Sequence, residues 1–200
     1  MFSIGNITEK LRIASFNCSS EVVVDLFAGI GYFVLPYLIH AKAKHVHACE
    51  INPDSVEALK VNLKSNGVEE RCTVHFGDNR LQCPTDVADR VNLGLIPSSE
   101  LSWETACLAL KNDSGGMLHI HANVDSTNQN VEQTNCIQTQ FKYPEWELWT
   151  NYAISTIEKV FLRLKNRTWT VKFLHLEHVK SYGPHVDHVV LDLECRPVQM

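Results

Sequence analysis

The fold is decided by the stretch VVVDLFAGIGYF, residues 22–33. Its β-branched run is typical of a strand that is buried on both faces, as in a parallel sheet. Gly29 permits a turn that residues with a Cβ rarely make, and Gly31 lets the backbone approach a ligand closely. Ligands of open α/β sheets bind beyond the carboxyl ends of the strands, so this turn is a candidate cofactor site. The same two glycines also fit a strand–helix turn that holds no ligand.

Strand-like and helix-like patterns alternate along the rest of the chain. Helices are predicted over 29–43, from the N-cap Asn52 to Gly67, and over about 145–166. Two final alternating runs meet at 182–184 and predict an antiparallel pair. We therefore predict an α/β fold, Rossmann-like and doubly wound, with a mostly parallel seven-stranded sheet and an antiparallel C-terminal strand. The predicted strands before the final pair are 21–27, 45–50, 72–76, 88–93 and 116–121.

Composition indicates one globular domain over residues 1–200, with the polar segment 123–140 as a long flexible loop. No apolar run approaches the roughly 20 residues that span a bilayer, so we expect no membrane contact. The seven cysteines form no C-x-x-C pair, which predicts a cytoplasmic protein without disulfides. The net charge of −5 is unusual for a stand-alone RNA-binding domain. A nucleic-acid substrate would need either lysines and arginines that cluster on one face or another segment that binds it. The sequence is silent on oligomeric state, and a monomer is the working expectation.

Histidines are numerous, but their spacing does not predict a metal site. His45 and His47 share one strand face, as do His119 and His121. A zinc site needs further ligands with suitable geometry, so we expect these pairs to be partly buried polar side chains and predict no metal. His185 and His188 flank the predicted hairpin turn and are expected to be exposed.

Acidic residues at two strand ends favour a cofactor over an empty turn. Glu50 ends the second strand, where a carboxylate can accept hydrogen bonds from both ribose hydroxyls of a nucleoside. Asp78 follows the third strand and can accept from an adenine amino group, while Asn79 offers a backbone N–H to the ring. The third glycine of the dinucleotide fingerprint is missing, so the turn is poorly suited to bind a pyrophosphate. A nucleoside without phosphates fits better, and S-adenosylmethionine is the common one.

At this point the chain resembles the class I S-adenosylmethionine-dependent transferases, through the D-x-F-x-G-x-G-x-F turn that begins at Asp25. Its first residues, MFSIGNITEKLR, narrow the resemblance to the family shared by tRNA guanine-N1 methyltransferases and tRNA aminocarboxypropyltransferases. The resemblance implies that Ser3 and Lys10 contact the cofactor, and a cationic Lys10 suits its carboxylate. It adds Arg12 as a catalytic candidate. Lys10 and Arg12 would equally suit a solvated helix face.

The segment after the fourth strand separates the branches of this family. Methyltransferases carry an Asn-Leu-Pro or Asn-Pro-Pro motif there, whereas this chain reads NLGLIPSS from Asn92. That form resembles the aminocarboxypropyltransferase branch. It implies transfer of the 3-amino-3-carboxypropyl group of S-adenosylmethionine to the side chain of the tricyclic wybutosine precursor base beside the anticodon of phenylalanine tRNA. It also implies an upstream tRNA-binding portion absent from residues 1–200.

Asn92 is the second catalytic candidate, because it would position either the acceptor or the methionine arm. Capping of the strand end is the alternative role for this side chain. Two alternative functions stay open: methyl transfer to tRNA, and a non-catalytic module that has lost the cofactor. No general base is evident. We expect Glu50→Ala to weaken cofactor binding with little change in the melting temperature of the free protein.

Overall fold

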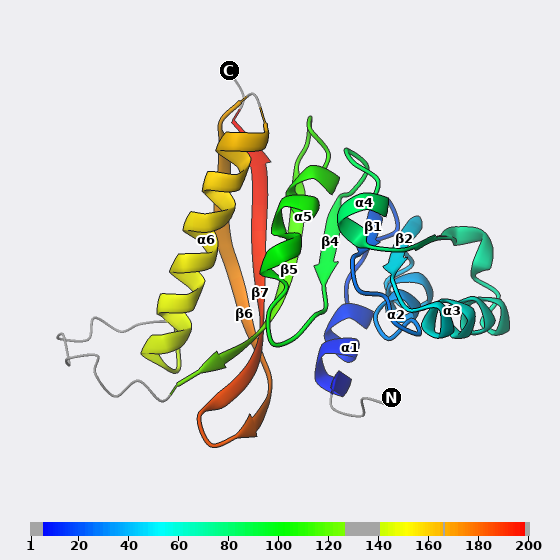
Figure 1. The fold of residues 1–200 in the computed structure, drawn as a ribbon, viewed down its shortest axis with the longest axis horizontal. Coiled ribbons are helices and arrows are strands. Elements are labelled where there is room, and N and C mark those ends of the chain that lie inside the picture. The colour runs from blue at the N-terminus through cyan, green and yellow to red at the C-terminus, as the bar shows by residue number, and fades with distance from the viewer. Residues whose placement is uncertain (1–5, 127–140, 166, 199–200) are drawn as a thin grey trace.

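A computed structural model describes residues 6–126, 141–165 and 167–198. The described strands form one sheet in the order β3-β2-β1-β4-β5-β7-β6 (Figure 1). β1 to β5 are parallel, whereas β7 is antiparallel to both β5 and β6. The predicted doubly wound sheet with an antiparallel C-terminal strand is therefore confirmed. The strands are β1 (Val22–Asp25), β2 (His45–Glu50), β3 (Cys72–Phe76), β4 (Arg90–Leu93), β5 (Gly116–Asp125), β6 (Trp169–Gly183) and β7 (Val186–Pro197).

Two predicted boundaries were wrong. The helix expected over 29–43 is α2, which begins only at Val34, because Gly29 and Gly31 adopt positive φ angles of 54° and 100° that a helix cannot contain. β5 extends to Asp125 by pairing with β7, so the start of the loop expected over 123–140 is strand. Residues 127–140 lie outside the described residues. The helices are α1 (Ile7–Ala14), α2 (Val34–Ile39), α3 (Pro53–Ser65), α4 (Asn79–Gln82), α5 (Trp103–Ala109) and α6 (Pro144–Leu164), with short 3₁₀ turns η2 (Glu69–Arg71) and η3 (Glu100–Ser102).

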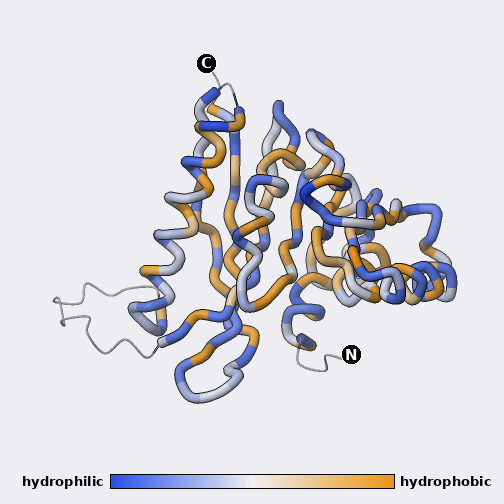
Figure 2. The backbone as a smooth tube through the Cα atoms, viewed as in Figure 1, coloured by the Kyte–Doolittle hydropathy of each residue, from blue (hydrophilic) through white to orange (hydrophobic). Residues whose placement is uncertain are grey.

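Each face of the sheet has its own hydrophobic core, because side chains alternate along a strand. Val23 packs with α1, α2 and α3 on one face. Val24, the next residue, packs with α5 and α6 on the other face. The hydropathy colouring agrees, with hydrophobic residues concentrated in the central strands and alternating with hydrophilic ones along α6 (Figure 2). The parallel strands are therefore covered on both sides, as their continuous apolar sequence predicted.

α1 is held to the sheet by a buried network of charged and polar groups. Arg12 donates to Glu9 on α1 at 2.7 and 2.8 Å, and to Asp192 on β7 at 2.5 Å. Asp192 also bonds His119 of β5 at 2.5 Å, and Arg90 of β4 contacts the other ring nitrogen of His119 at 2.6 Å. Burial opposes ionisation of Asp192, but the bonds from His119 and Arg12 outweigh it and hold its pKa well below the usual range.

This network predicts that Asp192→Asn costs about 3 kcal/mol of unfolding free energy at pH 7, because buried Arg12 and His119 both lose a carboxylate and Arg12 keeps only Glu9. A carboxylate with a lowered pKa stabilises the fold above its unfolded pKa of about 3.9, and this contribution is lost as pH falls through the folded pKa. The gap between wild type and variant should therefore be constant above about pH 5 and shrink below pH 4. Urea denaturation at several pH values measures it.

Glu194→Gln is the matched control, because Glu194 lies on the same strand and pairs with Arg196 in a more exposed ion pair. That change should stay within about 0.5 kcal/mol of wild type. An equally small effect of Asp192→Asn would refute a stabilising role for the network.

Candidate functional site

A cavity of about 540 Å³ opens at the carboxyl ends of the parallel strands. This is the edge that the fold class predicts for a ligand, and the volume lies in the range of small-molecule sites. Its walls come from the ends of β1 and β2, the turn after β3, and the segment that leads from β4 into η3. The lining residues are Leu26, Phe27, Cys49, Glu50, Ile51, Gly77, Asp78, Asn79, Arg80, Leu95, Ser98, Ser99, Glu100, Leu101 and Ser102.

Glu50 joins the glycine turn to this cavity. One carboxylate oxygen accepts the backbone N–H of Gly29 at 2.7 Å, and the other accepts that of Asn52 at 2.7 Å. Gly29 has open space where a Cβ would stand, whereas a Cβ on Gly31 would lie 3.0 Å from Leu59. The two positions therefore require glycine for different reasons. Gly29 leaves the side of the turn that faces a ligand open, whereas Gly31 allows α3 to pack closely.

The turn after β3 places Asp78 and Asn79 in the same cavity. Asp78 caps α4 and forms an ion pair with Arg80 at 2.5 Å. The hydrogen bonds from Arg80 lower the pKa of Asp78 to about 2, so its carboxylate is ionised. The Asn79 side chain donates to Leu26 at 3.0 Å and accepts from Ser102 at 2.9 Å. Since that side chain serves the fold, the predicted ligand contact of Asn79 is left to its backbone N–H.

Asp25 and Asn92 lie together beneath the glycine turn and do not line the cavity. Asn92 Nδ2 donates to Asp25 Oδ1 at 3.2 Å, and both side chains are fully buried. Burial raises the pKa of Asp25 to about 6. Asp25 Oδ2 and Asn92 Oδ1 have no hydrogen-bond partner among the described residues. Because most buried polar atoms are paired, two unpaired oxygens here are typical of a site that accepts further donors.

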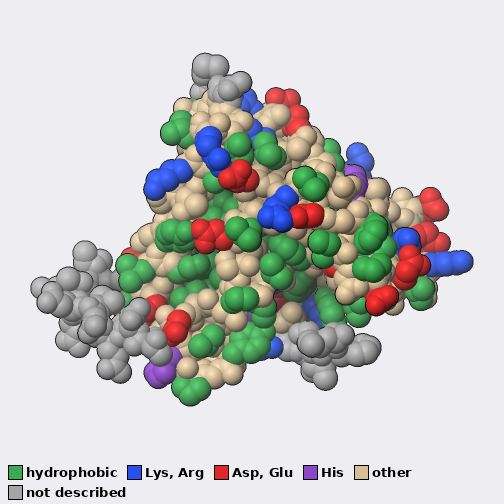
Figure 3. All heavy atoms as spheres, viewed as in Figure 1, with side chains coloured by type: hydrophobic (Ala, Val, Ile, Leu, Met, Phe, Trp, Pro, Cys, Tyr) green, Lys and Arg blue, Asp and Glu red, His purple; other side chains and the backbone are tan. Residues whose placement is uncertain are grey.

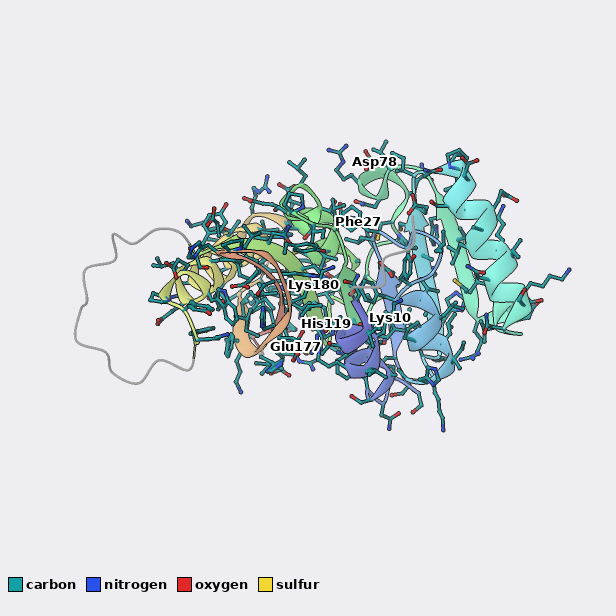
Figure 4. The ribbon with its side chains drawn as sticks, turned by 90° about the horizontal axis from the view of Figure 1, so that it is seen from below. Lys10, Phe27, Asp78, His119, Glu177 and Lys180 are labelled. Atoms are coloured by element: carbon teal, nitrogen blue, oxygen red, sulfur yellow. The ribbon has the colours of Figure 1, made fainter. Side chains whose placement is uncertain are left out.

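The α1 candidates lie on the opposite side of the sheet from Asp78. Figure 4 shows Lys10 and His119 on one side, and Phe27 and Asp78 on the side that carries α4. The Lys10 ammonium lies 4.3 Å from the ring centre of Tyr32, which follows Gly31, so Lys10 stays beside the turn. Arg12 is engaged by Glu9 and Asp192, so its catalytic role stays a prediction. Ser3 lies outside the described residues.

The sequence analysis missed the apolar wall of the cavity. Ile51 and Leu101 are 64% and 83% exposed, and Leu95 is 41% exposed. On the face seen in Figure 3, hydrophobic side chains gather across the middle of the molecule. A usable signal was present, because Phe27, Ile51 and Leu95 each lie within two residues of the end of β1, β2 or β4. An apolar wall with carboxylates at its ends can hold a flat ring and its polar substituents.

Of the two histidines that were predicted to be exposed beside the hairpin turn, the structure confirms one and contradicts the other. His185 is exposed as expected, but the expectation for His188 was wrong, because it is 1% exposed and its Nε2 lies 3.0 Å from Nδ1 of His121. Across residues 6–126, 141–165 and 167–198 no cluster of three His, Cys, Asp or Glu side chains could hold a metal ion. No helix in the same ranges has the length and apolar character needed to cross a membrane.

Comparison with known proteins agrees with this geometry. The family described as the TRM5/TYW2 methyltransferase domain matches residues 1–144. The tRNA wybutosine-synthesizing protein 2 homolog of Danio rerio is 54% identical over 210 residues, which cover 99% of this chain and 52% of that protein. The Homo sapiens protein of the same name is 46% identical over 228 residues, with 98% and 51% covered. The chain thus spans about half the length of these relatives.

Solved structures give the same fold. M. jannaschii TYW2, in complex with AdoMet, aligns with a TM-score of 0.80 and 29% identity over 99% of this chain and 78% of that one. The M. jannaschii tRNA m1G37 methyltransferase aligns with a TM-score of 0.69 and 23% identity over 98% of this chain and 51% of that one, a likeness of fold alone. The class I methyltransferase fold is confirmed, and with most of its length matched by the family, the chain belongs to the TRM5/TYW2 methyltransferase domain family.

Proposed function

We propose that residues 1–200 are the S-adenosylmethionine-dependent catalytic domain of a tRNA aminocarboxypropyltransferase that acts in the cytoplasm. The group transferred is 3-amino-3-carboxypropyl. The acceptor is the side chain of the tricyclic wybutosine precursor base beside the anticodon of phenylalanine tRNA. The names of the relatives from Danio rerio and Homo sapiens support this reading, as does the AdoMet complex of M. jannaschii TYW2.

The cavity residues fit an adenosyl group. Glu50 is ideally placed at the end of β2 for ribose hydroxyls, since a carboxylate with two backbone donors keeps lone pairs for further bonds. The apolar wall suits adenine, and Asp78 suits its amino group. Asp25 Oδ2 and Asn92 Oδ1 are unpaired acceptors beneath the turn, where they would receive the ammonium of the methionine arm. Lys10, with Ser3, would receive the carboxylate of that arm.

The cofactor would supply a sulfonium with three activated carbons, so the protein decides the outcome by orientation. Asn92 and Phe33 are placed to orient the methionine arm, because both side chains lie close to Gly94, just after the end of β4. Arg12 contributes through the network that fixes α1, and hence Lys10, against the sheet. No metal takes part in this scheme.

One observation carries the preference for aminocarboxypropyl over methyl transfer. The proline of the methyltransferase motif Asn-Leu-Pro falls on Gly94 in this chain. A Cβ on Gly94 would lie 3.1 Å from a ring carbon of Phe33 and 3.2 Å from Nδ2 of Asn92. The described packing of Phe33 and Asn92 therefore depends on the absence of a side chain at this position.

The net charge of −5 supports the idea that tRNA is bound mainly by another part of the protein. tRNA-binding proteins gain most of their affinity from cationic side chains on phosphates. The chain spans about half of its relatives' length, so we propose that residues upstream in such proteins grip the tRNA. The present domain would then contribute chiefly the cofactor site and the chemistry.

The first test uses S-adenosylmethionine that is labelled either on the methyl group or on the carboxyl carbon. The protein, expressed with any residues that its gene encodes upstream of Met1, is incubated with phenylalanine tRNA that carries the tricyclic precursor base. We expect tRNA to retain the carboxyl label and not the methyl label. Retention of the methyl label alone would establish the methyltransferase alternative. Retention of neither label, without cofactor binding by calorimetry, would indicate a non-catalytic module.

The second test is Glu50→Ala. Loss of charge-assisted hydrogen bonds should weaken S-adenosylmethionine binding by at least about 1.5 kcal/mol, roughly tenfold, in calorimetry. The structure changes our expectation for the free protein, because the variant also leaves the N–H groups of Gly29 and Asn52 without their acceptor. We therefore expect the free protein to lose about 1–2 kcal/mol of stability as well.

Glu57→Ala is the control, since Glu57 is an exposed residue of α3 that pairs with Lys60. Neither affinity nor stability should change by more than about 0.5 kcal/mol. Unchanged affinity in Glu50→Ala, together with lowered stability, would mean that Glu50 serves the turn only.

A further inference from the structure

A row of buried polar side chains crosses four neighbouring strands, β1, β4, β5 and β7. Asp25 of β1 pairs in register with Asn92 of β4, which pairs with His119 of β5. His121 lies two residues beyond His119 and therefore faces the same side. His188 of β7 completes the row through its bond to His121.

Four members of this row carry a buried atom without a partner among the described residues. These atoms are Asp25 Oδ2, Asn92 Oδ1, His121 Nε2 and His188 Nδ1. Unpaired buried polar atoms are rare in folded proteins, and each costs free energy until a ligand or water satisfies it. A run of them next to the proposed cofactor turn points to a use in chemistry.

His121 adjoins the segment that orients the reaction. Its ring centre lies 5.1 Å from that of Phe33, the residue that packs over Gly94. The chain after β4 continues along β5 at this point, with Ser98 bridging to Ala122 and Asn123 donating to Pro97 at 2.9 Å. His188 connects His121 to the protein surface, since the His188 ring stacks on Tyr182, which is 47% exposed.

We propose that His121 and His188 form a proton relay that carries the proton released by the acceptor base to the protein surface. This inference rests on the proposed function. The acceptor carbon loses its proton as it bonds to the γ-carbon of the transferred group, while the γ-carbon–sulfur bond breaks and its electron pair neutralises the sulfonium. The proton enters at His121 Nε2, the Nδ1 proton of His121 moves to His188 Nε2, and the Nδ1 proton of His188 leaves beside Tyr182.

The chemistry of the pair suits a relay better than a single base. Burial lowers the pKa of His121 well below its usual value and that of His188 to about 4, so both rings are neutral at pH 7. His119, Arg12, Lys180 and His178 add to this shift, whereas Asp192 opposes it at His121. Because the bond joins Nδ1 of one ring to Nε2 of the other, both rings change together from the Nδ1–H to the Nε2–H tautomer. The proton crosses without an imidazolium having to persist in the buried site.

The chain contains a matched control pair. His47 Nδ1 lies 3.0 Å from His75 Nε2, and the two rings are 5.2 Å apart at 42°, which are also the values for His121 and His188. The control pair lies on β2 and β3, is only half-buried, and does not line the cavity. The two pairs differ in location and burial, so a comparison isolates those properties.

The kinetic test compares His121→Gln, His188→Gln, the double variant and His47→Gln in single-turnover transfer of the carboxyl label to the precursor tRNA. Each relay variant should lower the rate about 100-fold, the lower range for proton-transfer catalysis, with unchanged dissociation constants for S-adenosylmethionine and tRNA. The double variant should be no slower than the single variants by more than a few-fold, because either change breaks the relay. His47→Gln should keep the wild-type rate. A full rate in His188→Gln, or losses confined to binding, would overturn the relay.

A second measurement needs no variant and no turnover. ¹⁵N NMR of the histidine-labelled wild-type protein with S-adenosylmethionine should show both rings neutral at pH 7, in the same tautomer and coupled across the shared hydrogen bond. A charged ring or opposite tautomers would overturn the relay even if the variants fail to fold. Coupled tautomers in a wild-type protein that transfers no carboxyl label would refute the proposed function instead.

Discussion

The hydrogen bond from the Gly29 N–H to the Glu50 carboxylate is the contact on which the site depends. It ties the turn after β1 to the end of β2, and the other oxygen of Glu50 holds the chain where α3 begins. Gly29 makes this bond from a left-handed conformation, with φ of 54°, which residues with a Cβ rarely adopt. One carboxylate thus links the cavity lining, the glycine turn and the N-cap residue of α3.

Under the proposed function, this dependence would join binding and folding in a single residue. Sequence reasoning assigns Glu50 to a ligand, because a carboxylate at a strand end needs a reason to be there. In the structure it already has two backbone partners. The two roles are compatible, since an ionised carboxylate can accept about four hydrogen bonds. Under the proposed function, substitution of Glu50 would therefore affect both the stability of the turn and the affinity for the cofactor.

The fold was predictable from the sequence because its signals are local. The β-branched run before Asp25, the Asn52 cap and the turn at Gly183 each specify their own segment, and strand order then follows from fold class. The pairing of Arg12 with Asp192 was not predictable, because the two residues are 180 positions apart and no periodic pattern connects them. The predicted exposure of His188 was wrong for the same reason, because its burial depends on contacts distant in the sequence. A position beside a hairpin turn suggests exposure, but the first residues of β7 pair with β5.

In the proposed reaction, the row of side chains at the strand ends, rather than the glycine turn, would decide which carbon leaves the sulfonium. The turn and Glu50 would hold an adenosyl group in the same way for either reaction. Gly94 is different, because its lack of a side chain lets Phe33 lie close to Asn92 and also reach His121. A side chain there would require Phe33 and the Asn92 amide to shift by a few tenths of an ångström. The difference between two branches of one family can therefore reside in a missing Cβ, which no fingerprint of conserved polar residues would record.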